Sequence, residues 1–169
     1  MDVDEFDRFY AGSFHRIAGQ ISVMIGDRDE AQDCVQEAFV RAWSHRRKLD
    51  GAKSPEAWVR TTAYRLAVSR WRRVALSRRN PDRALQPITP EPEPNVEHKA
   101  LVEALRQLPD TQRQAIVLHH LCDLSVADIA CEVGVPVGTI KARLSRGRSA
   151  LLALLREDTT GLAEGARHV

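Results

Sequence analysis

The chain has 169 residues, of which 43% are hydrophobic and 28% charged, and its formal net charge at pH 7 is +2. This composition is typical of a soluble globular protein, and no apolar run is long enough to cross a bilayer, so we expect no membrane insertion. The acidic start MDVDEFDRF lacks the apolar segment of a signal peptide, and the cysteines lie inside helical patterns. We therefore predict a reduced, cytoplasmic protein.

Two amphipathic helices are predicted at the start of the chain. Apolar residues recur at helical spacing over residues 4–25, and Gly26 is suited to end this helix. Asp27 is the expected N-cap of a second helix that continues to about Arg47. Glu30 lies at the reciprocal position of a capping box, which strengthens this prediction.

The second helix has polar side chains opposite its apolar stripe. They are Asp33, Gln36, Glu37 and Arg41, three and four residues apart. One interpretation is a solvated face with internal ion pairs, each worth about 0.3 kcal/mol. The other is a docking face for a partner helix, and periodicity does not choose between the two.

A third helix is predicted to begin at Ser54-Pro55-Glu56, which supplies an N-cap, a proline in the first position and an acid near the positive end of the dipole. Its expected buried stripe is Val59, Ala63, Leu66, Ala67 and Val74. Basic and aromatic residues are interleaved off this stripe: Arg60, Arg65, Arg72, Arg73, Trp58, Tyr64 and Trp71. Cations bind phosphates and rings stack on bases, so this face favours a nucleic-acid strand. The alternative is that the tryptophans belong to the core and the arginines are solvated.

Helical periodicity disappears in residues 76–97, where prolines recur. We expect a flexible, extended linker with a reach on the order of 60 Å, since proline-rich chain spans about 3.1 Å per residue. It would separate two small helical domains, residues 1–75 and 98–157, and residues 158–169 would form a disordered tail. The predicted fold class is therefore all-α.

Residues 125–152 predict a helix-turn-helix. Ser125 is a suitable N-cap, and Gly134 fits the left-handed position that ends a helix just before a proline. Ala130 is small enough for two helices to approach closely, and Ile140 would anchor the second helix in the core. With the helices expected before it, the motif completes a four-helix second domain.

The outer face of the second helix in this motif is basic. It contains Thr139, Lys141, Arg143, Ser145, Arg146 and Arg148. In a helix-turn-helix protein the second helix enters the major groove, where lysine and arginine bind phosphates and guanine edges. The alternative is an ordinary helical hairpin with a solvated basic face. Glycine, proline and periodicity agree, which favours DNA binding.

No catalytic constellation is found in the sequence, so we expect neither an enzyme nor a cofactor. There is no glycine-rich phosphate loop, and the carboxylates belong to helix surfaces or caps. His119, His120 and Cys122 lie close together but lack a second pair of ligands at zinc spacing. We therefore interpret them as helix residues rather than metal ligands.

Together these motifs resemble a bacterial extracytoplasmic-function (ECF) sigma factor of RNA polymerase, of the minimal two-domain type. AQDCVQEAFVRAW is similar to the second helix of the family's first conserved domain, with its Asp-x-x-Gln-Glu-x-Phe signature. SPEAWVRTTAYRLAVSRWRR resembles the promoter-melting helix. PVGTIKARLSRGR is the most specific part of the match to the second conserved domain, and the resemblance covers about Phe6 to Leu155.

The resemblance implies three sites, with promoter DNA and core RNA polymerase as partners. Clamp helices of the largest polymerase subunit would bind Asp33, Gln36, Glu37 and Arg41. The melted −10 strand would be engaged by Arg60, Tyr64, Arg65, Trp71, Arg72 and Arg73. The −35 duplex would be read by Thr139, Lys141, Arg143, Ser145, Arg146 and Arg148. The flap of the second-largest subunit is a further expected contact, and the linker would run towards the RNA exit channel.

The chain departs from the family at two positions of the melting helix. It has Arg65 where an asparagine is common and Ser69 where an aspartate is common. These departures bear on which −10 sequence the chain prefers more than on whether it acts as a sigma factor. The short tail leaves no room for a regulatory domain, so we expect a separate anti-sigma factor. Two other functions stay open: a conventional helix-turn-helix regulator, which leaves residues 1–75 unexplained, and a sigma mimic that sequesters an anti-sigma factor.

Overall fold

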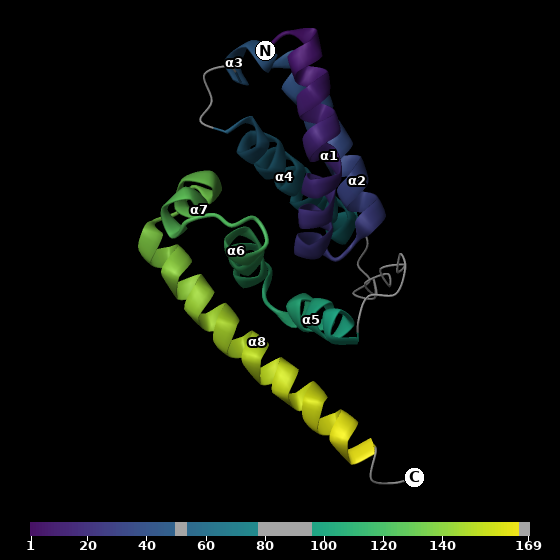
Figure 1. The fold of residues 1–169 in the computed structure, drawn as a ribbon, viewed down its shortest axis with the longest axis vertical. Coiled ribbons are helices and arrows are strands. Elements are labelled where there is room, and N and C mark those ends of the chain that lie inside the picture. Colours follow the sequence, from purple (N-terminus) through teal and green to yellow (C-terminus); the bar gives the residue numbers. More distant parts are fainter. Residues whose placement is uncertain (50–53, 78–95, 166–169) are drawn as a thin grey trace. The chain divides into compact units, whose positions relative to one another are not determined.

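The computed structural model describes residues 1–49, 54–77 and 96–165, with the backbone alone for 74–77, 96–98 and 157–165. Within these ranges all the regular elements are α-helices, which confirms the predicted fold class (Figure 1). The chain divides into two compact units, Met1–Ile88 and Thr89–Val169. Most of the predicted linker, residues 78–95, lies outside the described residues. None of the described helices is long and apolar enough to span a membrane.

The first unit packs three long helices and one short helix together (Figure 1). They are α1 (Val3–Ile25), α2 (Arg28–Ser44), α3 (Arg46–Leu49) and α4 (Pro55–Ser77). A capping box begins α1, because the Glu5 amide donates to the Asp2 carboxylate and the Asp2 amide donates to that of Glu5, both at 2.8 Å. Gly26 ends α1 with φ 76°, and Asp27 caps α2 through the Glu30 amide.

Two details of the predicted second helix are wrong. The helix ends at Ser44 rather than at about Arg47, and a separate short helix, α3, follows it. The Arg46 guanidinium lies 4.2 Å from the Trp43 ring centroid and donates to the Trp43 carbonyl at 3.1 Å, which fixes this turn. The second detail is the capping box expected at the start of α2. Asp27 accepts from the Glu30 amide, but the Glu30 carboxylate accepts from Arg70 of α4 at 3.3 Å, which links two helices.

Small side chains dominate the contact between α2 and α4. The buried positions on these helices include Ala31, Ala38, Ala42, Ala63 and Ala67. Longer aliphatic residues of α1, such as Ile17 and Ile21, complete the core. Cys34 is also buried here and its thiol donates to Glu30 at 3.4 Å. Burial, then this hydrogen bond, raises the pKa of Cys34 to about 12, so the group remains a thiol at neutral pH.

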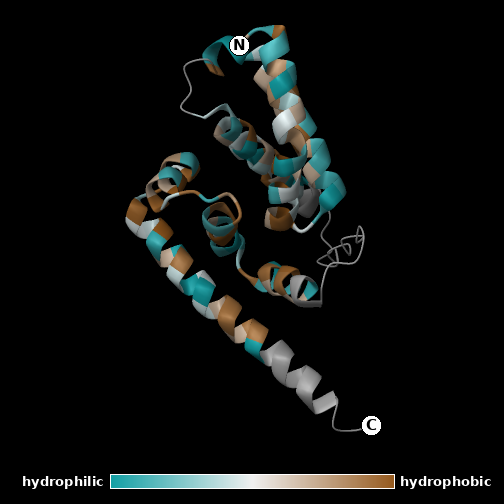
Figure 2. Cartoon of the chain, in the orientation of Figure 1, coloured by the Kyte–Doolittle hydropathy of each residue, from teal (hydrophilic) through white to brown (hydrophobic). Residues whose placement is uncertain are grey.

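The described residues of the second unit form four helices, as predicted. They are α5 (Val96–Gln107), α6 (Asp110–His120), α7 (Val126–Val133) and α8 (Val137–Gly165). Figure 2 shows alternating hydrophobic and hydrophilic bands along α8, as expected for a helix with one buried face. Its buried residues Ile140 and Leu144 pack with Val117 and Leu118 of α6 and Ile129 of α7 in one aliphatic core.

The structure gives the start of α6 and the end of α8. Pro109 is the N-cap of α6, and the Asp110 carboxylate accepts from the Arg113 guanidinium at 2.6 Å. Helix α8 also continues to Gly165, so residues 158–165, expected to be disordered, have helical backbone. Five of these eight residues are aspartate, threonine or glycine, which are weak helix formers. Adding residues to an established helix costs far less than starting one, which allows α8 to continue through them.

Gly147 lies at a close contact of α8 with α6. A Cβ atom added there would lie 3.0 Å from Ile116 Cγ1 and 3.4 Å from its Cδ1. Both contacts are to the buried side chain of a core residue, which has little room to move. The missing side chain therefore sets the distance between the two helices.

We predict that Gly147→Val lowers the free energy of unfolding of the second unit by about 2 kcal/mol, because added methyl groups overpack a filled core. The matched control is Gly138→Ala, where a Cβ meets no atom within 4 Å. That variant should change stability by no more than about 0.5 kcal/mol. Native-state hydrogen exchange of α6 and α8 amides measures both effects. Unchanged exchange in Gly147→Val would contradict the close-packing argument.

Candidate nucleic-acid interface

The turn between α7 and α8 has the geometry of a helix-turn-helix. The Ser125 hydroxyl accepts from the Asp128 amide at 3.1 Å and donates to the Asp128 carboxylate at 2.6 Å. Gly134 ends α7 with φ 75°, and its amide donates to the Ala130 carbonyl at 2.9 Å. Ile140 is fully buried, which fixes the rotation of α8 about its own axis. The predicted roles of Ser125, Ala130, Gly134 and Ile140 are confirmed.

The buried face of α8 determines which side chains remain outside. Lys141, Ser145, Arg146 and Arg148 are exposed, whereas Thr139 and Arg143 are half-buried at the edges of that face. All six predicted residues therefore lie on or beside the open side of one helix. Val137, the first residue of α8, is 41% exposed.

Two histidines connect the end of α6 to its surroundings. His119 Nδ1 lies 2.8 Å from the Leu124 carbonyl, so that nitrogen carries the proton. Burial, then the charges of His119 and Arg148, lowers the pKa of His120. A neutral His120 accepts from Arg148 Nε at 3.5 Å. Both imidazoles thus take part in local hydrogen bonds, in agreement with their interpretation as helix residues.

Helix α4 exposes most of the residues predicted to bind a single strand. Arg65, Arg72 and Arg73 are exposed, and Trp71 is 61% exposed, while Tyr64 is half-buried. The two alternatives for the tryptophans therefore divide: Trp71 is a surface residue, whereas Trp58 is half-buried with its ring 6.1 Å from that of His45. One exposed indole and three exposed arginines on the same helix offer a stacking surface for an unpaired base and cations for phosphates.

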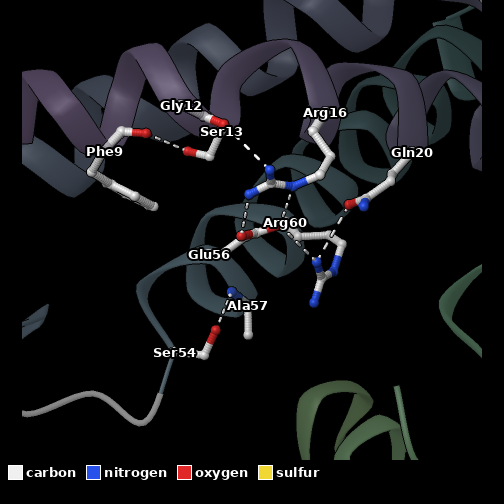
Figure 3. A network of polar contacts seen from close by, with 9 residues as sticks. All are labelled: Phe9, Gly12, Ser13, Arg16, Gln20, Ser54, Glu56, Ala57 and Arg60. Atoms are coloured by element: carbon white, nitrogen blue, oxygen red, sulfur yellow. Dashed lines mark hydrogen bonds and ion pairs between the residues drawn. The ribbon is translucent and has the colours of Figure 1, made fainter. Parts of the chain in front are cut away.

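Arg60 is the exception among the predicted DNA-binding residues. It is only 4% exposed, and its Nη1 lies 3.3 Å from Gln20 Oε1 and 3.7 Å from Glu56 Oε1. Glu56 also accepts two hydrogen bonds from Arg16, at 2.8 and 3.1 Å (Figure 3). The prediction that Arg60 lies off the buried stripe is wrong. Because α4 packs on α1 as well as α2, its buried face is wider than a single stripe.

The outer face of α2 is polar with one apolar residue. Asp33, Gln36 and Arg41 are exposed, and Arg41 Nε donates to Glu37 Oε1 at 2.9 Å. This is the internal ion pair that the spacing predicted. Val40 is 58% exposed on the same face, and the sequence analysis missed it. A valine four residues after Gln36 was the available signal.

A hollow of about 520 Å³ lies between α2 and α4. It is lined by Arg41, Thr62, Arg65, Leu66, Ser69 and Arg73. The structure therefore brings together one residue predicted to bind polymerase and two predicted to bind the −10 strand, along with Ser69, one of the positions that departs from the family pattern.

Comparison with known proteins assigns both units. Residues 10–76 match the family described as Sigma-70 region 2, and residues 98–151 match Sigma-70, region 4. The chain is 33% identical to the RNA polymerase sigma-H factor of Pseudomonas aeruginosa, over 92% of this chain and 91% of that protein. It is 32% identical to the ECF RNA polymerase sigma factor SigW of Bacillus subtilis, over 79% and 80%. The chain belongs to the ECF sigma factors.

A solved structure agrees with this assignment. The sigma factor RpoE from Bartonella quintana, in complex with the anti-sigma factor NepR, matches with a TM-score of 0.80 and 25% identity, covering 91% of this chain and 98% of that chain. This ECF sigma factor is therefore an alternative sigma factor. Sigma factors bind core RNA polymerase and promoter DNA, and the family is not one of enzymes.

We predict that Glu56→Ala destabilises the first unit by about 2 kcal/mol, because it removes the carboxylate beside the buried Arg60 guanidinium. Arg16→Ala removes only the exposed partner of Glu56 and should cost about 0.5 kcal/mol. Urea unfolding followed by tryptophan fluorescence measures both, since the tryptophans Trp43, Trp58 and Trp71 all belong to this unit. Equal losses in the two variants would show that Arg60 does not depend on Glu56.

Proposed function

We propose that this ECF sigma factor directs transcription from two-part promoters, with α8 reading the −35 duplex and α4 engaging the melted −10 strand. The observation that carries the proposal is the exposed basic face of α8 beside a correctly capped turn. Lys141, Ser145 and Arg146 follow the turn at the N-terminal half of α8, the half that enters the major groove in helix-turn-helix proteins.

The proposed −10 surface consists of Tyr64, Arg65, Trp71, Arg72 and Arg73. Three exposed arginines and an exposed indole on one helix support it, since unpaired DNA offers both phosphates and base faces. Arg60 supports this surface from within the fold. Binding of unpaired bases would offset the free-energy cost of opening the strands.

The outer face of α2, with Asp33, Gln36, Glu37 and Val40, is proposed to dock on the clamp helices of the largest polymerase subunit. The second unit would contact the flap of the second-largest subunit. An exposed valine surrounded by polar groups suits a small helix-on-helix contact. Once polymerase holds one unit on its promoter element, the effective concentration of the other unit at its own element rises. Two weak DNA contacts together then give strong binding.

Control by a separate anti-sigma factor is part of the proposal. The relative from Bartonella quintana is itself in complex with an anti-sigma factor, and its match extends over most of this chain. We also propose that the protein acts in the cytoplasm, where core polymerase and promoter DNA are found.

The decisive test is reconstituted transcription. The purified chain is added to core polymerase over a library of upstream regions from the source genome, and transcripts are sequenced. We expect transcripts that require the chain and share a motif in two parts. Binding to core without transcripts would favour a sigma mimic, and absence of binding to core would favour a conventional regulator; either result rejects the proposal.

We predict that Arg146→Ala weakens binding to the −35 duplex by about 1–3 kcal/mol, because a bidentate contact to a guanine edge would be lost. Arg156→Ala makes the same charge change on α8, about 15 Å further along the helix, and should have little effect. Fluorescence anisotropy with the duplex recovered from the transcription experiment measures both. Equal effects of the two substitutions would remove Arg146 from the reading face.

A further inference from the structure

The hollow between α2 and α4 unites residues that the sequence assigns to two different partners. We propose that it binds a phosphate group of single-stranded DNA, and that Arg41 belongs to this site rather than to the polymerase-docking face. The proposal rests on the proposed function, because the strand would be the melted −10 segment.

The chemistry of the lining supports an anionic ligand. Three guanidinium groups, those of Arg41, Arg65 and Arg73, border the hollow, and no carboxylate is among the lining residues. Each guanidinium offers a planar set of donors that fits two phosphate oxygens at once. Neighbouring cations repel one another, and a bound phosphate would relieve that repulsion.

The other lining residues support a nucleotide rather than a bare ion. Thr62 and Ser69 supply hydroxyl donors, and Leu66 supplies an apolar surface for a sugar or base. Each of these three residues and the two arginines of α4 lies three or four residues from another member of the set, so the five form one stripe on the helix. A hollow of about 520 Å³ is larger than a single phosphate needs and can hold a nucleotide unit.

Arg41 is the only contribution of α2 to this lining, and its pairing leaves it able to bind. Its contact with Glu37 is made through Nε, between two side chains that are 50% and 40% exposed. A solvent-exposed pair of this kind is weak. Its terminal nitrogens can therefore reach a phosphate while Nε remains beside Glu37, or the whole group can exchange one anion for the other.

Two substitutions follow from this competition. Arg41→Gln should lower affinity for a single strand roughly tenfold, as expected for a charged hydrogen bond, and should reduce the slope of log affinity against log salt by about 0.7. Glu37→Gln should raise the affinity for a single strand about threefold. It removes a carboxylate that competes with the phosphate for Arg41, and whose negative charge repels the phosphate. The matched control is Arg8→Gln, which makes the same charge change on an exposed arginine of α1.

The experiment uses the full chain labelled with ¹⁵N, titrated with the hexamer (dT)₆ at low salt. We expect the Nε–Hε signals of Arg41, Arg65 and Arg73 to shift together with one dissociation constant, while the signal of Arg8 stays in place. Parallel titrations with dTMP and inorganic phosphate separate a strand from a free anion, and both should bind more weakly than (dT)₆.

Several outcomes would overturn the proposal. Shifts at Arg65 and Arg73 without one at Arg41, or equal effects of Arg41→Gln and Arg8→Gln, would return Arg41 to the docking face. Equal binding of inorganic phosphate and (dT)₆ would mean a small-anion site. Binding of Arg41→Gln to core polymerase is measured separately and should be retained. If the unsubstituted chain fails to bind core while (dT)₆ binds as expected, the proposed function fails and the strand site remains.

Discussion

The close approach of helices through small side chains is the constraint on which both units depend. In the first unit, alanines at the contact of α2 and α4 leave little volume between the helix axes. Their outer faces therefore become neighbours, and Arg41 comes to share a hollow with Arg65 and Arg73. In the second unit, Gly147 allows α8 to lie directly on Ile116, which sets the rotation that leaves Lys141 and Arg146 outside.

Each unit buries an arginine whose guanidinium is held by hydrogen bonds or ion pairs. The first unit buries a charged group, and the Arg60 guanidinium is held by Gln20 and Glu56 between α1 and α4. Such a group is costly to desolvate and gives orientation rather than net stability. The second unit buries Arg113, whose guanidinium donates to the Arg106 and Leu108 carbonyls and to Asp110, while the rest of its core is mainly aliphatic. Salt should affect DNA binding by the exposed cations of α8 more than the folding of this unit.

Local sequence signals predicted the elements well, and tertiary packing accounts for the failures. Gly26, Asp27, Ser54 and Gly134 cap helices through local backbone geometry and nearby hydrogen bonds, so the amino-acid sequence alone is enough to identify them. Arg60 was wrongly predicted from the sequence to lie off the buried face. Its burial depends on a contact with Gln20 of α1, forty residues away, whereas the spacing of apolar residues along α4 indicates only one buried face. The hollow at Arg41 was not predictable, since it requires the distance between two helices and not the pattern along either.

Helix α8 is continuous from its first turn beside the reading face to Gly165, a length of 29 residues. At 1.5 Å per residue it forms a rod of about 44 Å, of which the first part is clamped by the core. Because the helix is held only at its N-terminal part, a tilt of about 10° there would move its C-terminal end by about 8 Å. A spectroscopic label near Gly165 would therefore magnify small changes in how the helix sits in a DNA groove, far from the groove itself.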